Sequence, residues 1–206
     1  MTYDDLVALA TELKDKLPDG VYPFACPVDF QTWYYQTVYA NGGWILNDDA
    51  TETGYGDEKT QEGIQCWIDM IEAGLSPSAS TLSETGSDAM FEGGQIAMTL
   101  AGSYMVPEYA SNDTIKDKID CVEVPTFNGI EDNCINGLGF AVYEGSKQKE
   151  EAEKFAIWMG SSEAQQIQGE TGVVISARED AQQYFAKANE PVSYTHLRAH
   201  ETELHL

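Results

Sequence analysis

Short apolar runs alternate with amphipathic stretches along most of the chain, and this alternation limits the fold more than any other feature. Residues 3–16 carry leucines at helical spacing, and Thr2 with Asp5 has the spacing of a capping box. The runs expected to form strands are VYPFAC (21–26), QIAMTLA (95–101), IDCVEVP (119–125) and GLGFAVY (137–143). Strands that alternate with helices predict an α/β fold with a largely parallel sheet.

Helix ends are marked by capping residues and glycines. Asp57 is expected to cap a helix that ends just before Gly74, and Ser162 with Gln165 suggests another capping box. Further helices are expected over 29–40, 87–94, 102–109, 147–159 and 177–189. The Ser/Thr/Gly-rich stretch 75–87 predicts a loop, and residues 44–56 predict a loop or a small hairpin.

The strongly negative charge of the chain argues against anionic partners. It has 35 Asp and Glu residues against 11 Lys and Arg, a formal net charge of −24 over 206 residues. Nucleic acids and anionic membranes are bound through cationic side chains, so we expect neither as a partner. A hydrophobic share of 42% is enough for a core in one or two domains, and no apolar run is as long as a membrane span.

Motifs of nucleotide-binding and hydrolytic enzymes are missing from the sequence. It has no G-x-x-x-x-G-K-[ST], G-x-G-x-x-G, G-x-S-x-G or H-E-x-x-H. Acidic pairs such as Asp48 and Asp49 could serve as a glycosidase dyad, but solvated surface is the simpler interpretation in so acidic a chain. Asp132 to Tyr143 has only part of a calcium loop, because Tyr143 replaces the final Glu. We expect no catalytic residue, metal or cofactor.

Cysteine and histidine offer little evidence for a metal site. The four cysteines, Cys26, Cys66, Cys121 and Cys134, form no C-x-x-C pair and predict isolated buried thiols. All three histidines, His196, His200 and His205, lie near the end of the chain. A helix would place His196 and His200 on one face, so a metal-binding tail is one hypothesis. However, VSYTHLRAHET is similar to a translated sequencing-library adaptor, which predicts a non-native, disordered tail over 192–206.

Aromatic residues gather in DFQTWYYQTVYANGGW and again after the apolar run 95–101. Aromatic faces stack on the C–H faces of sugars, and an adjacent Asp or Gln can bond the hydroxyls. Trp33 and Tyr104 are candidates for such stacking. Helical spacing with aliphatic residues instead predicts core positions for Tyr35, Tyr39 and Trp67.

The segment MFEGGQIAMTLAGSY resembles the signature of the extracellular solute-binding proteins of sugar ABC transporters, in which F-x-x-G-x-x-A-M precedes a strand, a glycine and an aromatic residue. Other segments agree in order: TYDDLVALATELKDK, TWYYQTVYANGGW, VEVPTFNG and GLGFAVYEGSKQKEEAEKFAIWMGSSEAQQ. GETGVVIS is similar to the family's G-x-x-P turn but lacks the proline. The resemblance covers roughly residues 1–191 and is strongest to the maltose-binding-protein-like members.

This resemblance implies a periplasmic-binding-protein-like α/β fold of two lobes, with most of the first lobe missing. Residues 1–123 and 161–191 would form the second, C-terminal lobe, and residues 124–160 a partial segment of the first. A monosaccharide or oligosaccharide would bind between the lobes and pass to the permease subunits of an ABC importer, without covalent chemistry. The whole protein would be a monomer outside the cell or in the periplasm, with the membrane reached only through a lipid anchor missing here.

The resemblance also implies ligand contacts. Tyr104 would stack on a sugar ring, and Asp29 would accept hydrogen bonds from hydroxyl groups. The full expected set is Asp29, Phe30, Trp33, Gly102, Ser103, Tyr104, Asn136 and Gly137. With most of the first lobe missing, strand 137–143 would expose its apolar face, and the chain alone would bind sugar poorly. The rival hypotheses are a sugar-active enzyme such as a glycoside hydrolase and a solute-binding protein for a non-sugar ligand.

Overall fold

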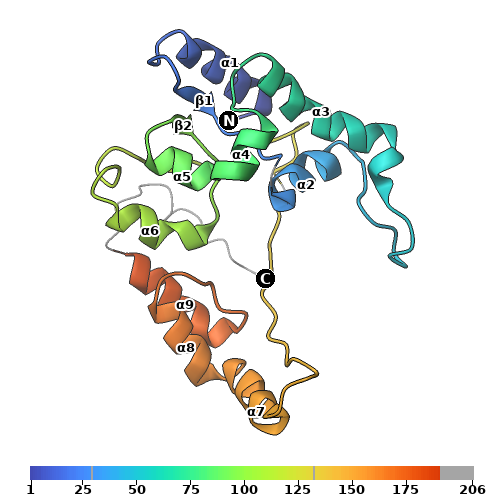
Figure 1. The fold of residues 1–206 in the computed structure, drawn as a ribbon, viewed down its shortest axis with the longest axis vertical. Helices are drawn as coiled ribbons and strands as arrows, with labels where there is room; N and C mark the ends of the chain where they lie inside the picture. Colours follow the sequence, from blue (N-terminus) through green and yellow to red (C-terminus); the bar gives the residue numbers. More distant parts are fainter. Residues whose placement is uncertain (29, 132, 191–206) are drawn as a thin grey trace. The chain divides into compact units, whose positions relative to one another are not determined.

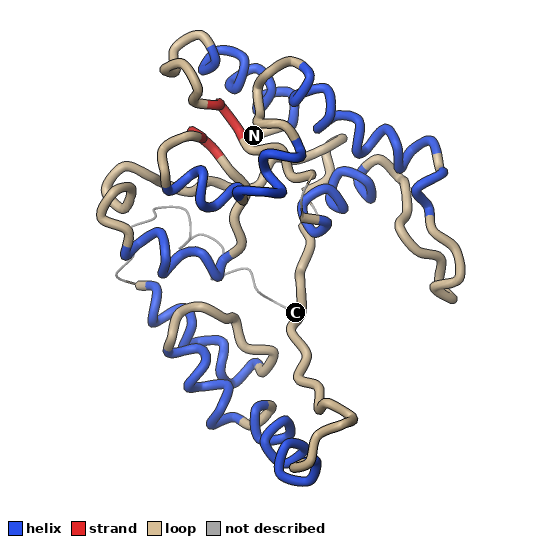
Figure 2. Tube along the Cα trace, in the orientation of Figure 1, coloured by secondary structure: helices blue, strands red, loops and turns tan. Residues whose placement is uncertain are grey.

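The computed structural model divides into two compact units, and the chain passes between them three times. The described residues are 1–28, 30–131 and 133–190. Unit 1 comprises residues 1–100 and 123–136, and unit 2 comprises residues 101–122 and those from 137 onward. Figure 2 shows that helices and loops make up most of both units, with two short strands.

Unit 1 is built around a pair of parallel strands (Figure 1). These are β1 (Tyr22–Phe24) and β2 (Ile96–Met98), with Tyr22 opposite Ile96 and Phe24 opposite Met98. Its helices are α1 (Tyr3–Lys14), α2 (Gln31–Ala40), α3 (Glu58–Glu72), α4 (Ala79–Thr85) and α5 (Ser87–Glu92), with a 3₁₀ turn η1 (Gly54–Gly56). A parallel pair requires a crossover connection, and α2 to α5 supply it. The predicted strands 21–26 and 95–101 are therefore confirmed, in shorter form.

Helix α1 begins with the predicted capping box. The Asp5 amide donates to Thr2 Oγ1 at 3.1 Å, and the Thr2 amide donates to Asp5 Oδ2 at 2.8 Å. These bonds satisfy donors that a helix start leaves free. At the other end of the helix, Lys14 Nζ donates to the Ala73 carbonyl at 2.6 Å, which ties α1 to the end of α3.

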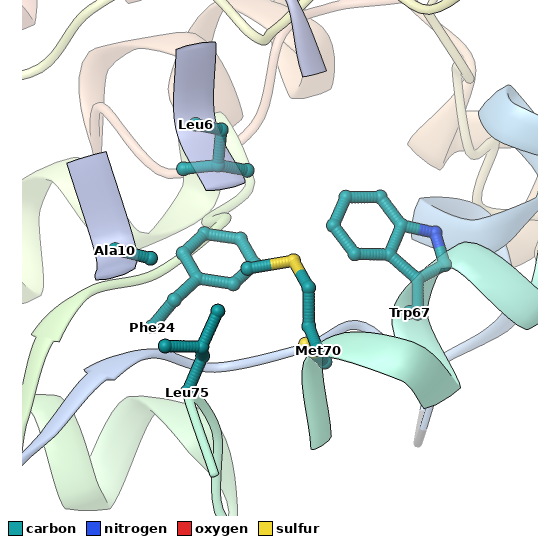
Figure 3. Packing of buried hydrophobic residues seen from close by; sticks show 7 residues of the cluster. Leu6, Ala10, Phe24, Trp67, Met70 and Leu75 are labelled. Carbon is teal, nitrogen blue, oxygen red and sulfur yellow. The ribbon is translucent and has the colours of Figure 1, made fainter. Parts of the chain in front are cut away.

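The core of unit 1 forms where α1, β1 and α3 meet, and Figure 3 shows its side chains. Its buried members include Leu6, Ala10, Phe24, Trp67, Met70 and Leu75. The Trp67 ring stacks on Phe24 with centroids 6.0 Å apart, and it makes a T-shaped contact with the Tyr3 ring, with centroids 5.3 Å apart. Large aromatic rings supply much of the buried apolar area in such a core. The predicted core position of Trp67 is confirmed.

Helices α2 and α3 approach closely because Gly63 has no side chain. A Cβ at Gly63 would lie 2.7 Å from the Val38 Cα, which is too close for any larger residue. At this contact Thr37 Oγ1 donates to the Gly63 carbonyl at 2.6 Å, and Trp67 Nε1 donates to Thr37 Oγ1 at 3.0 Å. As predicted, Asp57 caps α3, through its Oδ1. These contacts fix the angle between the two helices.

Three predictions about local structure are wrong. Residues 119–125 and 137–143 form no strand, because β1 and β2 pair only with each other and an isolated strand leaves its backbone groups unpaired. Near the first of these segments the chain makes a single parallel bridge, in which Thr126 N donates to the Met1 carbonyl and Tyr3 N to the Thr126 carbonyl. The stretch predicted as a loop over 75–87 contains α4, which Ser78 caps.

In the described part of unit 2 the regular secondary structure consists of helices, joined by loops. Its elements are η2 (Ser103–Met105), α6 (Val106–Ser111), α7 (Lys149–Met159), α8 (Ser162–Glu170) and α9 (Glu179–Asn189). Helices α8 and α9 pack closely at Gly169, where a Cβ would lie 2.9 Å from Tyr184 Cβ. Ser161, one residue before the predicted Ser162, caps α8, while the Gln165 side chain donates to the Met159 carbonyl instead of closing a capping box.

Helix α7 and the segment before it expose large apolar side chains. Phe155 is 60% exposed and Ile157 78% exposed, and no residue of α7 is buried. In residues 137–143, Leu138 is 81% exposed. The predicted exposure of this apolar segment is confirmed, although the segment is not a strand.

Candidate functional site

Two of the expected ligand residues meet at the start of α2 in unit 1. Phe30 is the extended N-cap residue of α2, and its carbonyl accepts from the Trp33 amide at 3.2 Å. The two rings meet edge to face with centroids 6.2 Å apart, and both are half-buried. The first turn of the helix thus presents a small aromatic surface. Asp29 lies outside the described residues.

The other aromatic candidate is Tyr104 in unit 2. Gly102 is extended, with φ −75° and ψ 154°, and its carbonyl accepts from the Met105 amide as η2 begins. The Tyr104 ring lies directly over Gly102: a Cβ there would be 2.2 Å from Tyr104 Cε1. Gly102 therefore lets the ring lie against the backbone, and Tyr104 keeps 46% of its surface exposed. Ser103, between them, is exposed.

The remaining predicted residues lie where the chain leaves unit 1. Asn136 is the last residue of unit 1, Gly137 is the first residue of the second segment of unit 2, and both are exposed. The eight predicted residues therefore divide between two units, each of which is described by itself. The structure brings together Phe30 with Trp33, and Gly102 with Tyr104.

Metal-binding chemistry finds no support in the described part of the chain. Within it, no group of three or more His, Cys, Asp and Glu residues is arranged to hold a metal ion. Asp132, which begins the partial calcium loop, and the tail histidines His196, His200 and His205 lie outside the described residues.

The thiols of Cys26 and Cys66 lie in or against the core and carry raised pKa values. Burial raises the pKa of each thiol to about 12. Nearby, Tyr3 Oη donates to the Cys66 carbonyl at 2.6 Å, and burial raises the pKa of Tyr3 as well. All four cysteines are free, but only Cys26 is fully buried. These groups stay neutral near pH 7 and are suited to structure rather than to nucleophilic chemistry.

A small cavity in unit 1 is lined by polar groups that already have partners. Trp67 Nε1 donates to Thr37 Oγ1, and Gln36 Nε2 donates to the Pro125 carbonyl at 3.2 Å. Because these groups are paired within the protein, the cavity is unsuited to binding a sugar.

The aromatic residues of α2 differ from the sequence prediction. Tyr39, predicted to be in the core, is 53% exposed, and Tyr35 is only half-buried. Helical spacing alone could not reveal this, because the buried side of α2 is formed instead by Thr32, Gln36, Thr37 and Val38. The sequence also gave no sign that Tyr55, in the 44–56 hairpin, would contact α2; its hydroxyl lies 3.0 Å from that of Tyr34.

The family of the chain follows from its sequence as a whole. Residues 1–166 match the family model described as bacterial extracellular solute-binding protein. The chain belongs to this family. A search among curated proteins finds no match for this solute-binding protein. Across its described residues, none of the helices combines the length and apolarity that a membrane span requires.

Solved structures of similar fold support the fold assignment. An ABC substrate-binding protein from Listeria monocytogenes in complex with cycloalternan is 22% identical, with a TM-score of 0.70 over 98% of this chain and 52% of that chain. The GacH receptor of Streptomyces glaucescens is 20% identical, with a TM-score of 0.70 over 94% of this chain and 50% of that one. The cyclic alpha-maltosyl-1,6-maltose binding protein from Arthrobacter globiformis is 19% identical, with a TM-score of 0.62 over 96% and 51%.

These likenesses confirm the predicted α/β fold of the periplasmic-binding-protein type. The solute-binding protein chain spans about half the length of the solved structures that it matches. The expected membership of the solute-binding family is likewise confirmed.

Proposed function

We propose that this protein binds a carbohydrate and delivers it to the permease subunits of an ABC importer. The observation that carries the proposal is the Tyr104 ring, which lies over Gly102 with nearly half of its surface exposed on a chain of the solute-binding family. Stacking on C–H faces and hydrogen bonding to hydroxyl groups is the chemistry by which such a ring holds a sugar. The names of the similar structures support a sugar ligand, since they include cycloalternan, acarbose and alpha-D-tagatose.

The roles we propose follow from the side chains available. Tyr104 stacks on one sugar ring, and the Phe30–Trp33 pair offers a second aromatic surface in unit 1. Asp29 accepts hydrogen bonds from sugar hydroxyls. Ser103, Asn136 and Gly137 supply polar side-chain and backbone groups, and Gly102 positions the Tyr104 ring. The protein binds and releases its ligand without covalent chemistry.

We further propose that the whole protein has two lobes, with residues 1–123 and 161–191 in one and residues 124–160 in the other. The exposed Phe155 and Ile157 support the presence of further protein in the whole molecule, because apolar side chains on an uncovered helix indicate a surface that packs against more chain. The family description places such proteins outside the cell. A lipid anchor, a monomeric state and docking to the permease complete the proposal.

A sugar titration followed by intrinsic tryptophan fluorescence tests the carbohydrate ligand. Because Trp33 is half-buried against Phe30 and Trp67 is fully buried, we expect Trp33 to report binding in unit 1. Maltose and maltoheptaose should change the emission only at millimolar concentration, since the chain spans about half the length of the matched structures. A Trp33→Phe variant should lose the signal. The absence of any response to sugars, together with tight binding of a peptide or an ion, would overturn the carbohydrate ligand.

A further inference from the structure

Four tyrosines form one cluster on the surface of unit 1, which we call the tyrosine surface: Tyr34, Tyr35, Tyr39 and Tyr55. The rings of Tyr34 and Tyr35 meet edge to face at 5.1 Å, and those of Tyr35 and Tyr39 at 6.2 Å. Tyr39 is 53% exposed, Tyr55 is 42% exposed, and the other two are half-buried. None of these residues belongs to the expected ligand set, and of the four Tyr34 packs against the core of unit 1.

The hydroxyl groups of this cluster converge. The oxygens of Tyr34 and Tyr55 are 3.0 Å apart, although these residues come from α2 and from η1. The hydrogen bond with Tyr34 is the main cause that raises the pKa of Tyr55, and the pKa of Tyr35 is raised by burial and by the hydroxyl of Tyr55. The hydroxyls of Tyr35 and Tyr55 therefore remain protonated at neutral pH, and each can donate and accept hydrogen bonds.

Two glycines hold the tyrosine surface in place. A Cβ at Gly54 would lie 2.0 Å from the Trp44 carbonyl oxygen, so only glycine lets η1 lie against this part of the hairpin and place Tyr55 beside α2. Gly63 allows α2 to lie directly on α3. The Gln61 side chain adds a further link, since its Nε2 donates to the Tyr55 carbonyl at 3.1 Å. A surface fixed by close backbone contacts loses little freedom when a ligand binds.

The chemistry of this surface suits a neutral ligand with many hydroxyl groups. The tyrosine surface itself carries no charge, on a chain with 35 acidic residues. Exposed tyrosine combines an apolar ring with a hydroxyl, and a pyranose combines an apolar C–H face with hydroxyls around its edge. A cationic partner would be held by carboxylates and an anionic one by Lys or Arg, and the cluster offers neither.

We propose that the tyrosine surface binds pyranose units of a neutral oligosaccharide, in addition to the aromatic contacts at Phe30, Trp33 and Tyr104. The inference rests on the proposed function for its ligand class, and it makes the ligand an oligosaccharide rather than a monosaccharide. The Tyr39 and Tyr55 rings supply the stacking faces, and the Tyr34–Tyr55 hydroxyl pair supplies the hydrogen bonds.

Isothermal titration and NMR titration of the full chain with maltoheptaose and with maltose test this proposal. The variants are Tyr39→Ala, which removes an exposed ring, and Tyr55→Phe, which removes only a hydroxyl. Tyr143→Ala, which truncates another exposed tyrosine in unit 2, is the matched control, and Tyr104→Ala reports on the expected ligand site. Far-UV circular dichroism checks that each variant is folded, and the Tyr39 and Tyr55 ring signals of the unaltered chain report contact without any substitution.

We expect Tyr39→Ala and Tyr55→Phe to weaken maltoheptaose binding by roughly three- to tenfold while maltose binding and the Tyr143→Ala control stay unchanged. Maltoheptaose should also shift the Tyr39 and Tyr55 ring signals. The inference about the tyrosine surface alone would be overturned if the ring signals of the unaltered chain and the affinities of both variants stay unchanged while Tyr104→Ala loses maltoheptaose affinity. The tyrosine surface would then be a contact for another protein. A complete lack of sugar binding to the unaltered chain would overturn both this inference and the proposed function.

Discussion

Replacing Gly102 by alanine should separate sugar affinity from stability. The backbone at Gly102 has a negative φ that alanine adopts without strain. The new methyl group, however, would lie 2.2 Å from Tyr104 Cε1 and 2.6 Å from Cδ1, where ordinary contacts start at about 3.4 Å. Since the backbone can stay, the Tyr104 ring must turn away from Gly102.

The size of both effects can be worked from this geometry. Turning a side chain about 30° from its preferred rotamer costs about 0.5–1.5 kcal/mol. Alanine also restricts the unfolded chain, which stabilises the fold by about 0.4–1 kcal/mol. The two nearly cancel, so the free energy of unfolding should change by less than about 1 kcal/mol, which is about 2–4 °C in Tm. Losing the stacking face should weaken sugar binding about three- to tenfold.

Urea unfolding and an NMR titration with maltose measure the two quantities on the same samples. Gly139→Ala is the matched control, because a Cβ at Gly139 meets no atom within 4 Å. The combined variant Gly102→Ala/Tyr104→Ala gives the decisive comparison, since Gly102→Ala should have no effect on affinity once the ring is absent. If Gly102→Ala weakens binding equally with and without Tyr104, the glycine does not act through the ring and the reasoning is refuted.

Three further predictions concern the core, the thiols and the exposed helix. Thr37→Val should lower the free energy of unfolding by about 1–3 kcal/mol, because the buried Trp67 Nε1–H loses its acceptor; urea unfolding measures this, and an unchanged value would contradict it. Cys26 and Cys66 should resist a thiol reagent at pH 8 and react only as the pH approaches their raised pKa of about 12 or as the chain unfolds; rapid labelling of the folded chain would refute this. The exposed apolar side chains of α7 should cause the chain to self-associate, and Ile157→Lys should reduce this association, measured by light scattering, without a measurable change in Tm. Equal association of the variant and the unaltered chain would show that α7 does not mediate it.

Features set by neighbouring residues were predictable from the sequence. The Thr2–Asp5 capping box and the Asp57 cap lie where their spacing predicted, because each depends on residues within one helical turn. Helix α4 was missed because its start is locally ambiguous: Ser78 caps it, and serine favours both loops and helix N-caps. The two strand predictions that failed depend on distant partners, which no local pattern reports.

The candidate site was predictable only in part. The aromatic composition indicated Trp33 and Tyr104, but the close contact of the Tyr104 ring with Gly102 is a matter of backbone direction. The pairing of Tyr34 with Tyr55 spans a hairpin whose course depends on the close approach of Gly54 to Trp44. Such contacts depend on how the backbone folds, so a sequence pattern can indicate which residue types are present but not which of them come into contact.

The bridge between the first residues and Thr126 has a consequence for synthesis on the ribosome. Tyr3 and Met1 pair with Thr126, so these residues leave the ribosome long before their partner exists. At the usual rate of about 5–20 residues per second, the delay is roughly 6–25 s. During that time α1 can already join the core with β1 and α3, but the backbone groups of Met1 and Tyr3 lack their partner Thr126. A nascent chain stalled before Thr126 should therefore be cut near Met1 by a protease more readily than one stalled well after it.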